Sequence, residues 1–357
     1  MTDTLRIRHF DAWRFIAVSL VIQSHLIKYS NLKFLTETYP LLSLLGHFGN
    51  LGVMISFFLS GFVICQGLMK EQATTSALSV KAFYLRRAFR ILPSLWLYLA
   101  VMALLGGLGW VAITPAKIGK SALFLCNMNF SGSCSGFVGH TWSLACQEQF
   151  YLIFPLVFMV FGLMVRPKIL LMMLSLMTLA SLGLCALGSA WLSGYLSWMT
   201  FILSGCAAAL YWHRLVHTCR GLSVRGWLTA LTLLIACIVL LPVAFEQYVR
   251  TIIYPPLIGL LILGTPVSHL KVRAFFENSK LAYLGKISFS TYLWQQLATG
   301  YHPNLSPWWT VLFVLCVWPL AHLSYQYFER PLIGIAAGWS KAIKQQELFG
   351  RSSEFAK

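Results

Sequence analysis

The sequence predicts an all-α fold, a polytopic integral membrane helical bundle of about ten transmembrane helices with both termini in the cytoplasm. Of the 357 residues, 58% are hydrophobic and only 10% are charged, whereas soluble domains carry about a quarter charged residues. The apolar residues gather in runs close to the about 20 residues that a helix needs to cross a bilayer. The formal net charge is +17, and the basic residues lie in short gaps between these runs. That distribution is typical of membrane topology and argues against a nucleic-acid-binding domain, which gathers its basic residues on a polar fold.

The ten predicted spans follow one another along the chain. We expect the first run to be retained as a span, because no small-residue cleavage site precedes the next polar stretch. Residues 1–335 are predicted to form one transmembrane domain, and residues 336–357 a basic cytoplasmic tail that can lie on the inner membrane surface as an amphipathic helix. The spans are predicted over residues 12–30, 45–67, 91–112, 142–164, 168–188, 195–212, 226–244, 251–267, 284–301 and 308–329.

The basic residues set the orientation of these spans, because membrane proteins keep most of their lysines and arginines on the cytoplasmic side. With ten spans, the two termini lie on one side of the membrane. The termini and the gaps on that side hold most of the basic residues, and we therefore predict that this side is cytoplasmic. The opposite side holds only Lys28, Lys33, Lys117, Lys120 and Arg250.

The longest predicted outer loop, over residues 113–140, contains Cys126 and Cys134, two of the nine cysteines. A disulfide between them is one alternative, if the loop faces an oxidising compartment, and two free thiols are the other. Most of the other cysteines lie inside apolar runs, where a cysteine behaves as a small hydrophobic residue. No cysteine pair has the spacing of metal ligands, and we expect no metal site.

Two ionisable residues lie inside the first predicted span. Arg14 and His25 are eleven residues apart, so on an α-helix they share nearly one face and lie about 16 Å apart along the axis. Ionisable groups within a membrane usually face the protein interior or a wet path. Arg14 can instead be an interfacial anchor paired with Asp11, and His25 can form a hydrogen bond that packs two helices together. Their shared face favours one tunnel with the arginine at its entrance.

A second basic group stands at the start of the third span. Arg86 and Arg90 are one helical turn apart, as are Arg87 and Arg90, so their guanidinium groups can converge on a phosphate. The alternative is that the three arginines only mark the cytoplasmic flank of the span.

A third polar group leads into the fourth span from the outer side. Its Glu148 is the one acidic residue well inside a predicted span, and a carboxyl group in that place suits a proton carrier or an acid–base group. The alternative is a structural pair with an arginine or a histidine. The group consists of His140, Trp142, Ser143, Gln147, Glu148 and Tyr151.

Weaker signals lie in the remaining spans. The small residues Gly52 and Gly61 are predicted to allow close helix packing, and Tyr292 stands among similar small residues in the ninth span. Glu329 and Arg330 are predicted to form an interfacial ion pair just before the proline that ends the last span.

These segments, taken in order, resemble the acyltransferase family 3 membrane proteins, the O-antigen acetylase type. The family pattern of an arginine, ten residues and a histidine in the first span is matched by FDAWRFIAVSLVIQSH. GNLGVMISFFLSGF resembles the second-span pattern, and RRAFRILPSLW, HTWSL, QFYLIFP, LGKISFSTYLW and YFERP resemble later blocks. The resemblance extends from about residue 5 to 335. Two positions differ, because Gln147 stands where the family usually has glutamate and Gln295 where it has histidine.

The resemblance implies transfer of an acyl group, commonly acetyl, from cytoplasmic acyl-CoA to a hydroxyl of a cell-surface or lipid-linked glycan. The implied catalytic residues are His25, as general base or as nucleophile, and Glu148, which directly follows Gln147. Four arginines would hold the phosphate-rich donor acetyl-CoA, and four residues in the outer half of the tunnel would hold the acceptor. The donor residues are Arg14, Arg86, Arg87 and Arg90; the acceptor residues are Trp142, Ser143, Tyr151 and Gln147.

The expected location is a cell membrane, the inner membrane of a bacterium, and the expected partners are acyl-CoA, the glycan acceptor and the lipid bilayer, without nucleic acid. The alternative function is a non-catalytic membrane protein or a transporter of a glycan or a small anion, which Gln147 and Gln295 favour. Coupled transporters often have internal repeats and charged relays across several spans, and neither is evident here.

Overall fold

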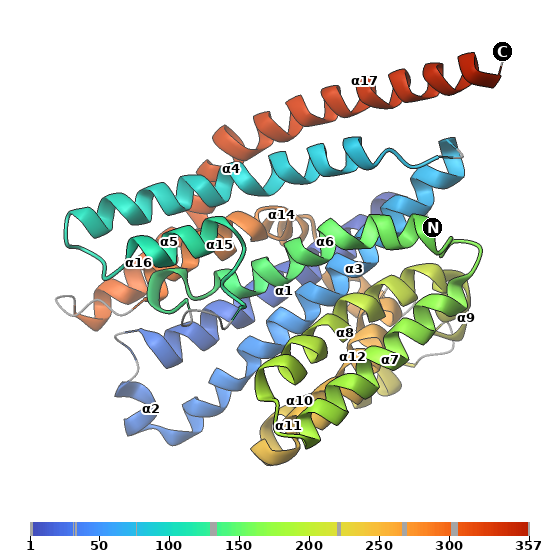
Figure 1. Ribbon diagram of the computed structural model, residues 1–357. Coiled ribbons are helices and arrows are strands. Elements are labelled where there is room, and N and C mark those ends of the chain that lie inside the picture. Colours follow the sequence, from blue (N-terminus) through green and yellow to red (C-terminus); the bar gives the residue numbers. More distant parts are fainter. Residues whose placement is uncertain are drawn as a thin grey trace. The chain divides into compact units, whose positions relative to one another are not determined.

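The computed structural model consists of helices and their connections in the residues it describes, which are 3–30, 32, 34–75, 77–128, 134–219, 223–265, 270–300 and 306–355 (Figure 1). This confirms the prediction of an all-α protein. The chain divides into two compact units, which are described in turn. Unit 1 comprises Met1–Gly67, Phe161–Phe289 and Thr299–Thr310, and unit 2 comprises Leu68–Val160, Ser290–Ala298 and Val311–Lys357.

Unit 1 contains the long first helix and most of the middle of the chain. Proline or serine marks several helix starts: Pro40 and Pro167 stand in the first turns of their helices, where the missing N–H costs nothing. Ser223 caps the tenth helix by accepting a hydrogen bond from the Gly226 backbone N–H at 3.1 Å. The helices are α1 (Asp3–Tyr29), α2 (Phe34–Thr38), η1 (Pro40–His47), α3 (Phe48–Thr75, which continues into unit 2), α7 (Pro167–Ala186), α8 (Ala190–Leu210), α9 (Trp212–Cys219), α10 (Val224–Leu240), α11 (Val243–Ile252), α12 (Tyr254–Gly264), α13 (Leu270–Phe276) and α14 (Ser279–Lys286).

Glycines on α3 let its neighbours approach closely. A Cβ atom at Gly52 would collide with the backbone carbonyl of Ala17 on α1, and one at Gly61 would collide with the backbone of Ile202 on α8. Membrane helices associate largely through such close packing of small residues, because lipid supplies no hydrophobic driving force between helices. The predicted packing role of both glycines is confirmed.

The first helix is also fixed against α14 and its neighbours. A Cβ atom at Gly285 would collide with the backbone of Asp11, so these two helices touch backbone to backbone. Trp13 donates a hydrogen bond to Thr265 Oγ1 at 3.2 Å and stacks on Phe276 with ring centroids 4.8 Å apart. These contacts set the rotation of α1 about its own axis within unit 1.

Replacing Gly285 with alanine is expected to lower the melting temperature of the detergent-solubilised protein. The added methyl group must push α14 away from Asp11, and such overpacking costs about 1–3 kcal/mol of unfolding free energy. Gly183→Ala on α7 is the matched control, because a Cβ atom there meets nothing within 4 Å. The control is expected to be neutral or slightly stabilising. Equal melting temperatures for the two variants would contradict the close contact.

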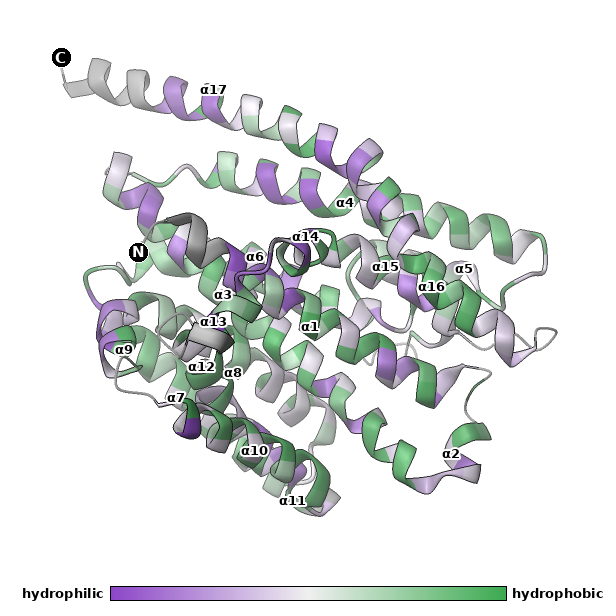
Figure 2. Ribbon diagram, turned by 180° about the vertical axis from the view of Figure 1, so that it is seen from behind, coloured by the Kyte–Doolittle hydropathy of each residue, from purple (hydrophilic) through white to green (hydrophobic). Residues whose placement is uncertain are grey.

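Unit 2 contains two long helices that run side by side, α4 and α17 (Figure 1). Ser79 caps α4 by accepting a hydrogen bond from the Ala82 backbone N–H at 3.2 Å. Figure 2 shows hydrophilic residues gathered in the first half of α4 and along α17, while the second half of α4 is hydrophobic. The helices are α4 (Val80–Gly107), α5 (Pro115–Ala122), η2 (Gly136–Val138), α6 (Thr141–Val160), α15 (Ser288–Thr299, whose end residues belong to unit 1), α16 (Pro307–Leu323, whose first residues belong to unit 1), the π-helical segment η4 (Ser324–Glu329) and α17 (Arg330–Phe355).

Among the described residues, six helical segments are long and apolar enough to cross a membrane, or eight if each of two bent pairs is one span. These eight segments match eight of the ten predicted spans, and the protein is a multi-pass membrane protein. The other two predictions, 12–30 and 284–301, do not reach this standard. Polar side chains such as Arg14 and His25 reduce the apolar character of α1, and the second region is divided between the short helices α14 and α15.

Helix α4 extends beyond the span that was predicted for it. Helix α4 begins at Val80 rather than at residue 91, so the arginine group lies inside the helix and not at its entrance. The boundary between the transmembrane domain and the basic tail, predicted at residue 335, stays a prediction; that residue lies within α17, which continues as one helix to Phe355.

Candidate active site

Helix α1 carries Arg14 and His25 as one continuous helix in unit 1. Arg14 Nη1 donates to Asp11 Oδ1 at 2.6 Å, and Asp11 is buried. The pair with Asp11, one of the two alternatives for Arg14, is therefore present. His25 is half-buried and packs edge-on against Tyr29, with ring centroids 5.5 Å apart. The uninterrupted helix keeps the predicted shared face of Arg14 and His25.

Arg86 holds three segments of unit 2 together. Its Nη2 lies 3.2 Å from Glu71 Oε2, and its Nη1 donates to the Ser340 hydroxyl on α17. Lys344 Nζ pairs with the same carboxylate oxygen at 2.7 Å, and the Ser79 backbone N–H donates to Oε1 at 3.0 Å. We call Glu71, Arg86, Ser340 and Lys344 the Glu71 clasp. Since Arg86 is already bound to a buried carboxylate, its structural role in the clasp stands beside the phosphate role predicted for it.

Arg87 and Arg90 face an acidic group instead. The guanidinium of Arg87 lies 4.7 Å from the ring centroid of Tyr151. Both arginines are close enough to Glu148 on α6 to interact with it electrostatically. Glu148 Oε1 is buried and accepts no hydrogen bond from any residue that the structure describes. A carboxyl oxygen in this condition can exchange a proton or a hydrogen bond with a bound molecule, which acid–base catalysis requires.

A second buried carboxylate, Glu329, was not predicted as part of this site. Glu329 is only 4% exposed and accepts hydrogen bonds from Ser290 at 2.5 Å and from Ser324 at 3.2 Å. It also interacts electrostatically with Arg90. The predicted ion pair with Arg330 is wrong, because Arg330 donates to Gln326 at 3.0 Å. Short π-helical segments such as the one that carries Glu329 occur frequently at functional sites.

The start of α6 is held in place by Tyr292 of α15. The Tyr292 hydroxyl donates to the backbone carbonyl of His140 at 2.5 Å and lies 2.6 Å from the Ser143 hydroxyl. Since a carbonyl oxygen can only accept, the Tyr292 hydroxyl donates its proton to His140. The Ser143 hydroxyl then donates to Tyr292 at 2.6 Å and, at the longer distance of 3.4 Å, to the same carbonyl. Ser143 therefore keeps its lone pairs as acceptors. Tyr292 thus has a defined hydrogen-bonding role, which its position among small residues did not predict.

Two further side chains fix the segment that precedes α6. Tyr98 of α4 is fully buried, donates to the Phe137 carbonyl at 2.5 Å and packs edge-on against the His140 ring. Gln296, one turn after Tyr292 on α15, donates to the Gly136 carbonyl at 3.1 Å. The backbone that carries the predicted acceptor residues is therefore held from two helices.

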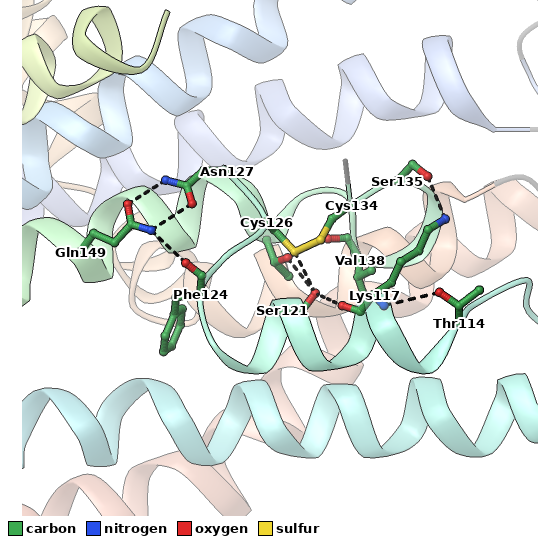
Figure 3. The surroundings of a disulfide bond; sticks show 11 residues. Thr114, Lys117, Ser121, Phe124, Cys126, Asn127, Cys134, Ser135, Val138 and Gln149 are labelled. Atoms are coloured by element: carbon green, nitrogen blue, oxygen red, sulfur yellow. Dashed lines mark hydrogen bonds between the residues drawn. A yellow bond between two sulfur atoms is a disulfide. The ribbon is translucent and has the colours of Figure 1, made fainter. Parts of the chain in front are cut away.

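A disulfide joins Cys126 to Cys134 and closes the loop before α6 (Figure 3). Of the two alternatives that the sequence left open, the disulfide is present. Ser121 on α5 approaches it, with its hydroxyl 3.2 Å from Cys126 Sγ and 3.1 Å from Thr141 Oγ1. Lys117 Nζ donates to the Ser135 hydroxyl at 2.9 Å. Because disulfides persist in oxidising compartments, the bond supports the predicted outer location of this loop.

The same loop is tied to α6 by a pair of amide side chains. Asn127 Nδ2 donates to Gln149 Oε1 at 2.7 Å, and Gln149 Nε2 donates in return to Asn127 Oδ1 at 3.0 Å and to the Phe124 carbonyl at 2.9 Å (Figure 3). Phe124 has a φ of 55°, an uncommon backbone conformation for a residue other than glycine. These hydrogen bonds therefore hold Phe124 and Asn127 against α6.

Replacing both Cys126 and Cys134 with serine is expected to lower the melting temperature, because a disulfide across so short a loop contributes about 2–3 kcal/mol. Dithiothreitol should lower the melting temperature of the wild type to that of the double variant and leave the variant unchanged. Alkylation followed by mass spectrometry counts the thiols directly. The seven other cysteines are free and remain in the double variant. If dithiothreitol lowers both melting temperatures equally, its effect does not come from the disulfide, and the stabilising role of the disulfide is contradicted.

The predicted site residues thus fall into separate groups. Unit 2 brings Glu148, Arg87, Arg90 and Tyr151 together, and it brings Ser143 to Tyr292. Arg14 and His25 belong to unit 1. Trp142 and Gln147 are partly exposed on α6, and Gln295 is fully buried. Within the described residues, no three His, Cys, Asp or Glu side chains are grouped closely enough to hold a metal ion.

Comparison with known proteins gives a family match over residues 7–325, described as an acyltransferase domain. The peptidoglycan O-acetyltransferase OatA of Listeria monocytogenes is 26% identical over 329 residues, which cover 80% of this chain and 51% of that protein. The putative peptidoglycan O-acetyltransferase YrhL of Bacillus subtilis is 28% identical over 328 residues, covering 80% of this chain and 50% of that protein. The chain thus spans about half the length of these relatives. No solved structure matches it.

Proposed function

Because the chain belongs to the acyltransferase domain family, we propose that it is an integral membrane O-acyltransferase that moves an acetyl group from cytoplasmic acetyl-CoA to a hydroxyl of a cell-surface or lipid-linked glycan. The observation that carries the proposal is that Arg87, Arg90 and Glu148 lie close together within a unit whose helices span the membrane. Charged groups within a membrane are costly and are usually kept for function.

The donor is proposed to bind at Arg87 and Arg90. Coenzyme A carries several phosphates, and guanidinium groups bind phosphate through paired, charge-assisted hydrogen bonds. Arg86 contributes mainly through the Glu71 clasp, which holds this part of α4 in place. Arg14, paired with Asp11, is proposed to orient the donor's arm or one of its phosphates.

The chemical step is proposed to begin at His25. As general base, its imidazole takes the proton of the acceptor hydroxyl while that oxygen attacks the thioester carbonyl carbon. The carbon–sulfur bond then breaks, the ester forms, and the proton passes from the imidazole to the thiolate of coenzyme A. Alternatively, His25 first takes the acyl group itself and passes it to the hydroxyl. Glu148 is proposed as the second acid–base group, because its Oε1 is buried and accepts no hydrogen bond from the described residues.

The acceptor is proposed to be a glycan, since relatives are named peptidoglycan O-acetyltransferases. Ser143 keeps its lone pairs free and can accept a hydrogen bond from a sugar hydroxyl, and Trp142, Gln147 and Tyr151 lie on the same helix. The location that follows is the cell membrane, the inner membrane of a bacterium.

The proposal is tested by mass spectrometry of surface glycans from cells with and without the protein. Acetyl esters, released by mild base and labelled when isotopic acetate feeds the acetyl-CoA pool, are expected only in cells that contain it. A glycan unchanged by loss of the gene would reject the enzyme and favour the non-catalytic alternative.

A further inference from the structure

An arginine in unit 1 lies largely buried and has no role in the chemistry described above. Arg250 stands in the last turn of α11, with only 12% of its side chain exposed. Taking a guanidinium out of water is costly unless good partners replace the lost hydration. The contacts of Arg250 therefore indicate whether its role is structural or whether it binds a ligand.

These contacts are weak. Arg250 Nη1 lies 3.5 Å from Glu246 Oε1, and its Nε lies 3.4 Å from the Ser197 hydroxyl. The guanidinium also lies 5.0 Å from the ring centroid of Trp198. None of these is the paired, short geometry that guanidinium forms with an anion, in which N···O distances are about 2.7–2.9 Å. Arg250 is thus held in place and remains under-bonded.

The local charge is positive. Glu246 is 40% exposed and is shared electrostatically between Arg250 and Lys28. One carboxylate thus faces two cations in this part of unit 1. A negatively charged group from a ligand would balance them.

The backbone beside Arg250 is broken. Helices α11 and α12 bend by 41° at the junction after Ile252, where Pro255 and Pro256 prevent a straight continuation. Broken spans in membrane proteins commonly mark a binding site near the break. On the same unit, Trp191, Tyr195 and Trp198 occur at helical spacing on α8, and Arg250 packs on the last of them.

We propose that Arg250, supported by the Trp198 ring, binds a carboxylate or phosphate carried by the acceptor glycan on the predicted outer side of the membrane. This inference rests on the proposed function, which supplies the glycan. The competing interpretation is an anchor in the belt of aromatic and basic residues found at membrane interfaces. An anchor would not distinguish a charged ligand from a neutral one.

The experiment measures binding to the purified full chain in detergent by microscale thermophoresis at low salt. The carboxylate probe is the disaccharide of N-acetylglucosamine and N-acetylmuramic acid, with its methyl ester as the neutral match; the phosphate probe is farnesyl diphosphate. Arg250→Gln is expected to weaken binding of an anionic probe at least tenfold and leave the ester unchanged. Glu246→Gln is expected to tighten anion binding, because it removes a competitor for the guanidinium. Arg225→Gln, an exposed arginine of the same unit, is the control and is expected to change neither.

A selective loss with the disaccharide assigns the carboxylate, and a selective loss with farnesyl diphosphate assigns the phosphate. Three results would overturn the inference: a wild type that binds neither anion, an Arg250→Gln protein that binds both as the wild type does, or equal loss of acid and ester. A Glu246→Gln protein that binds anions more weakly would count against it as well. Melting temperatures check that each variant is folded. Because no acetyl transfer is measured, failure here is distinct from failure of the proposed function, which the glycan analysis tests.

Discussion

Replacing His25 with alanine is expected to reduce acetyl transfer by about 10²–10⁴-fold, the range that a positioned proton-transfer group contributes. Without the imidazole, no group on α1 takes the proton of the attacking hydroxyl. His25 is only half-buried, so its replacement with alanine is expected to leave the fold intact. The measurement is the release of coenzyme A and the labelling of acceptor by radioactive acetyl-CoA in membranes.

The matched control is His213→Ala, because His213 is an exposed histidine of the same unit. It should retain wild-type activity, and both variants should melt at the wild-type temperature. Full activity in the His25→Ala protein would remove His25 from the mechanism. An inactive protein with a much lower melting temperature would instead give His25 a packing role.

Replacing Arg90 with alanine is expected to raise KM for acetyl-CoA by about ten- to a hundredfold, which corresponds to the loss of one charge-assisted hydrogen bond. The effect on kcat should be smaller, because phosphate is bound equally in the ground state and in the transition state. Steady-state kinetics at varied acetyl-CoA concentration measure this division.

Arg86→Ala is the contrasting variant. Since Arg86 is bound to Glu71 and Ser340, its loss should weaken the Glu71 clasp and lower the melting temperature, with little change in KM. Unchanged donor affinity in Arg90→Ala would assign the arginine group to topology and structure alone. A larger rise in KM for Arg86→Ala than for Arg90→Ala would reverse the roles.

Composition and the lengths of the apolar runs were enough to predict the fold class. Eight of the ten predicted spans match described segments that are long and apolar enough to cross a membrane, and the other two regions are interrupted by polar residues or by a break between two helices. The region around α1 contains Arg14 and His25, and the region around 284–301 divides at Ile287. Both regions pack against other helices of the protein, and such contacts cannot be read from hydropathy. The glycine contacts were predictable, because only small residues permit backbone contact in a membrane.

The sequence predicted which types of residue form the candidate site, but only some of the residues that they contact. Glu329 and Arg330 are adjacent in sequence, yet neighbouring residues on a helix point about 100° apart. Arg330 therefore turns back to Gln326, one turn earlier, while Glu329 faces inward to Ser290. The partners of Arg86 come from residues far along the chain, which no local pattern indicates. The network of Tyr98, Tyr292 and Gln296 was missed because its acceptors are backbone carbonyls, which carry no signal in the sequence.

The Glu71 clasp has a consequence for biosynthesis. Glu71 leaves the ribosome early, whereas Ser340 and Lys344 emerge more than 260 residues later. During that interval the carboxylate has no access to these two partners, so unit 2 cannot be completed until translation has passed Lys344. Chains interrupted before that point should be recognised by membrane quality-control proteases, and a truncation series followed by pulse–chase labelling would reveal a sharp rise in half-life once Lys344 is included.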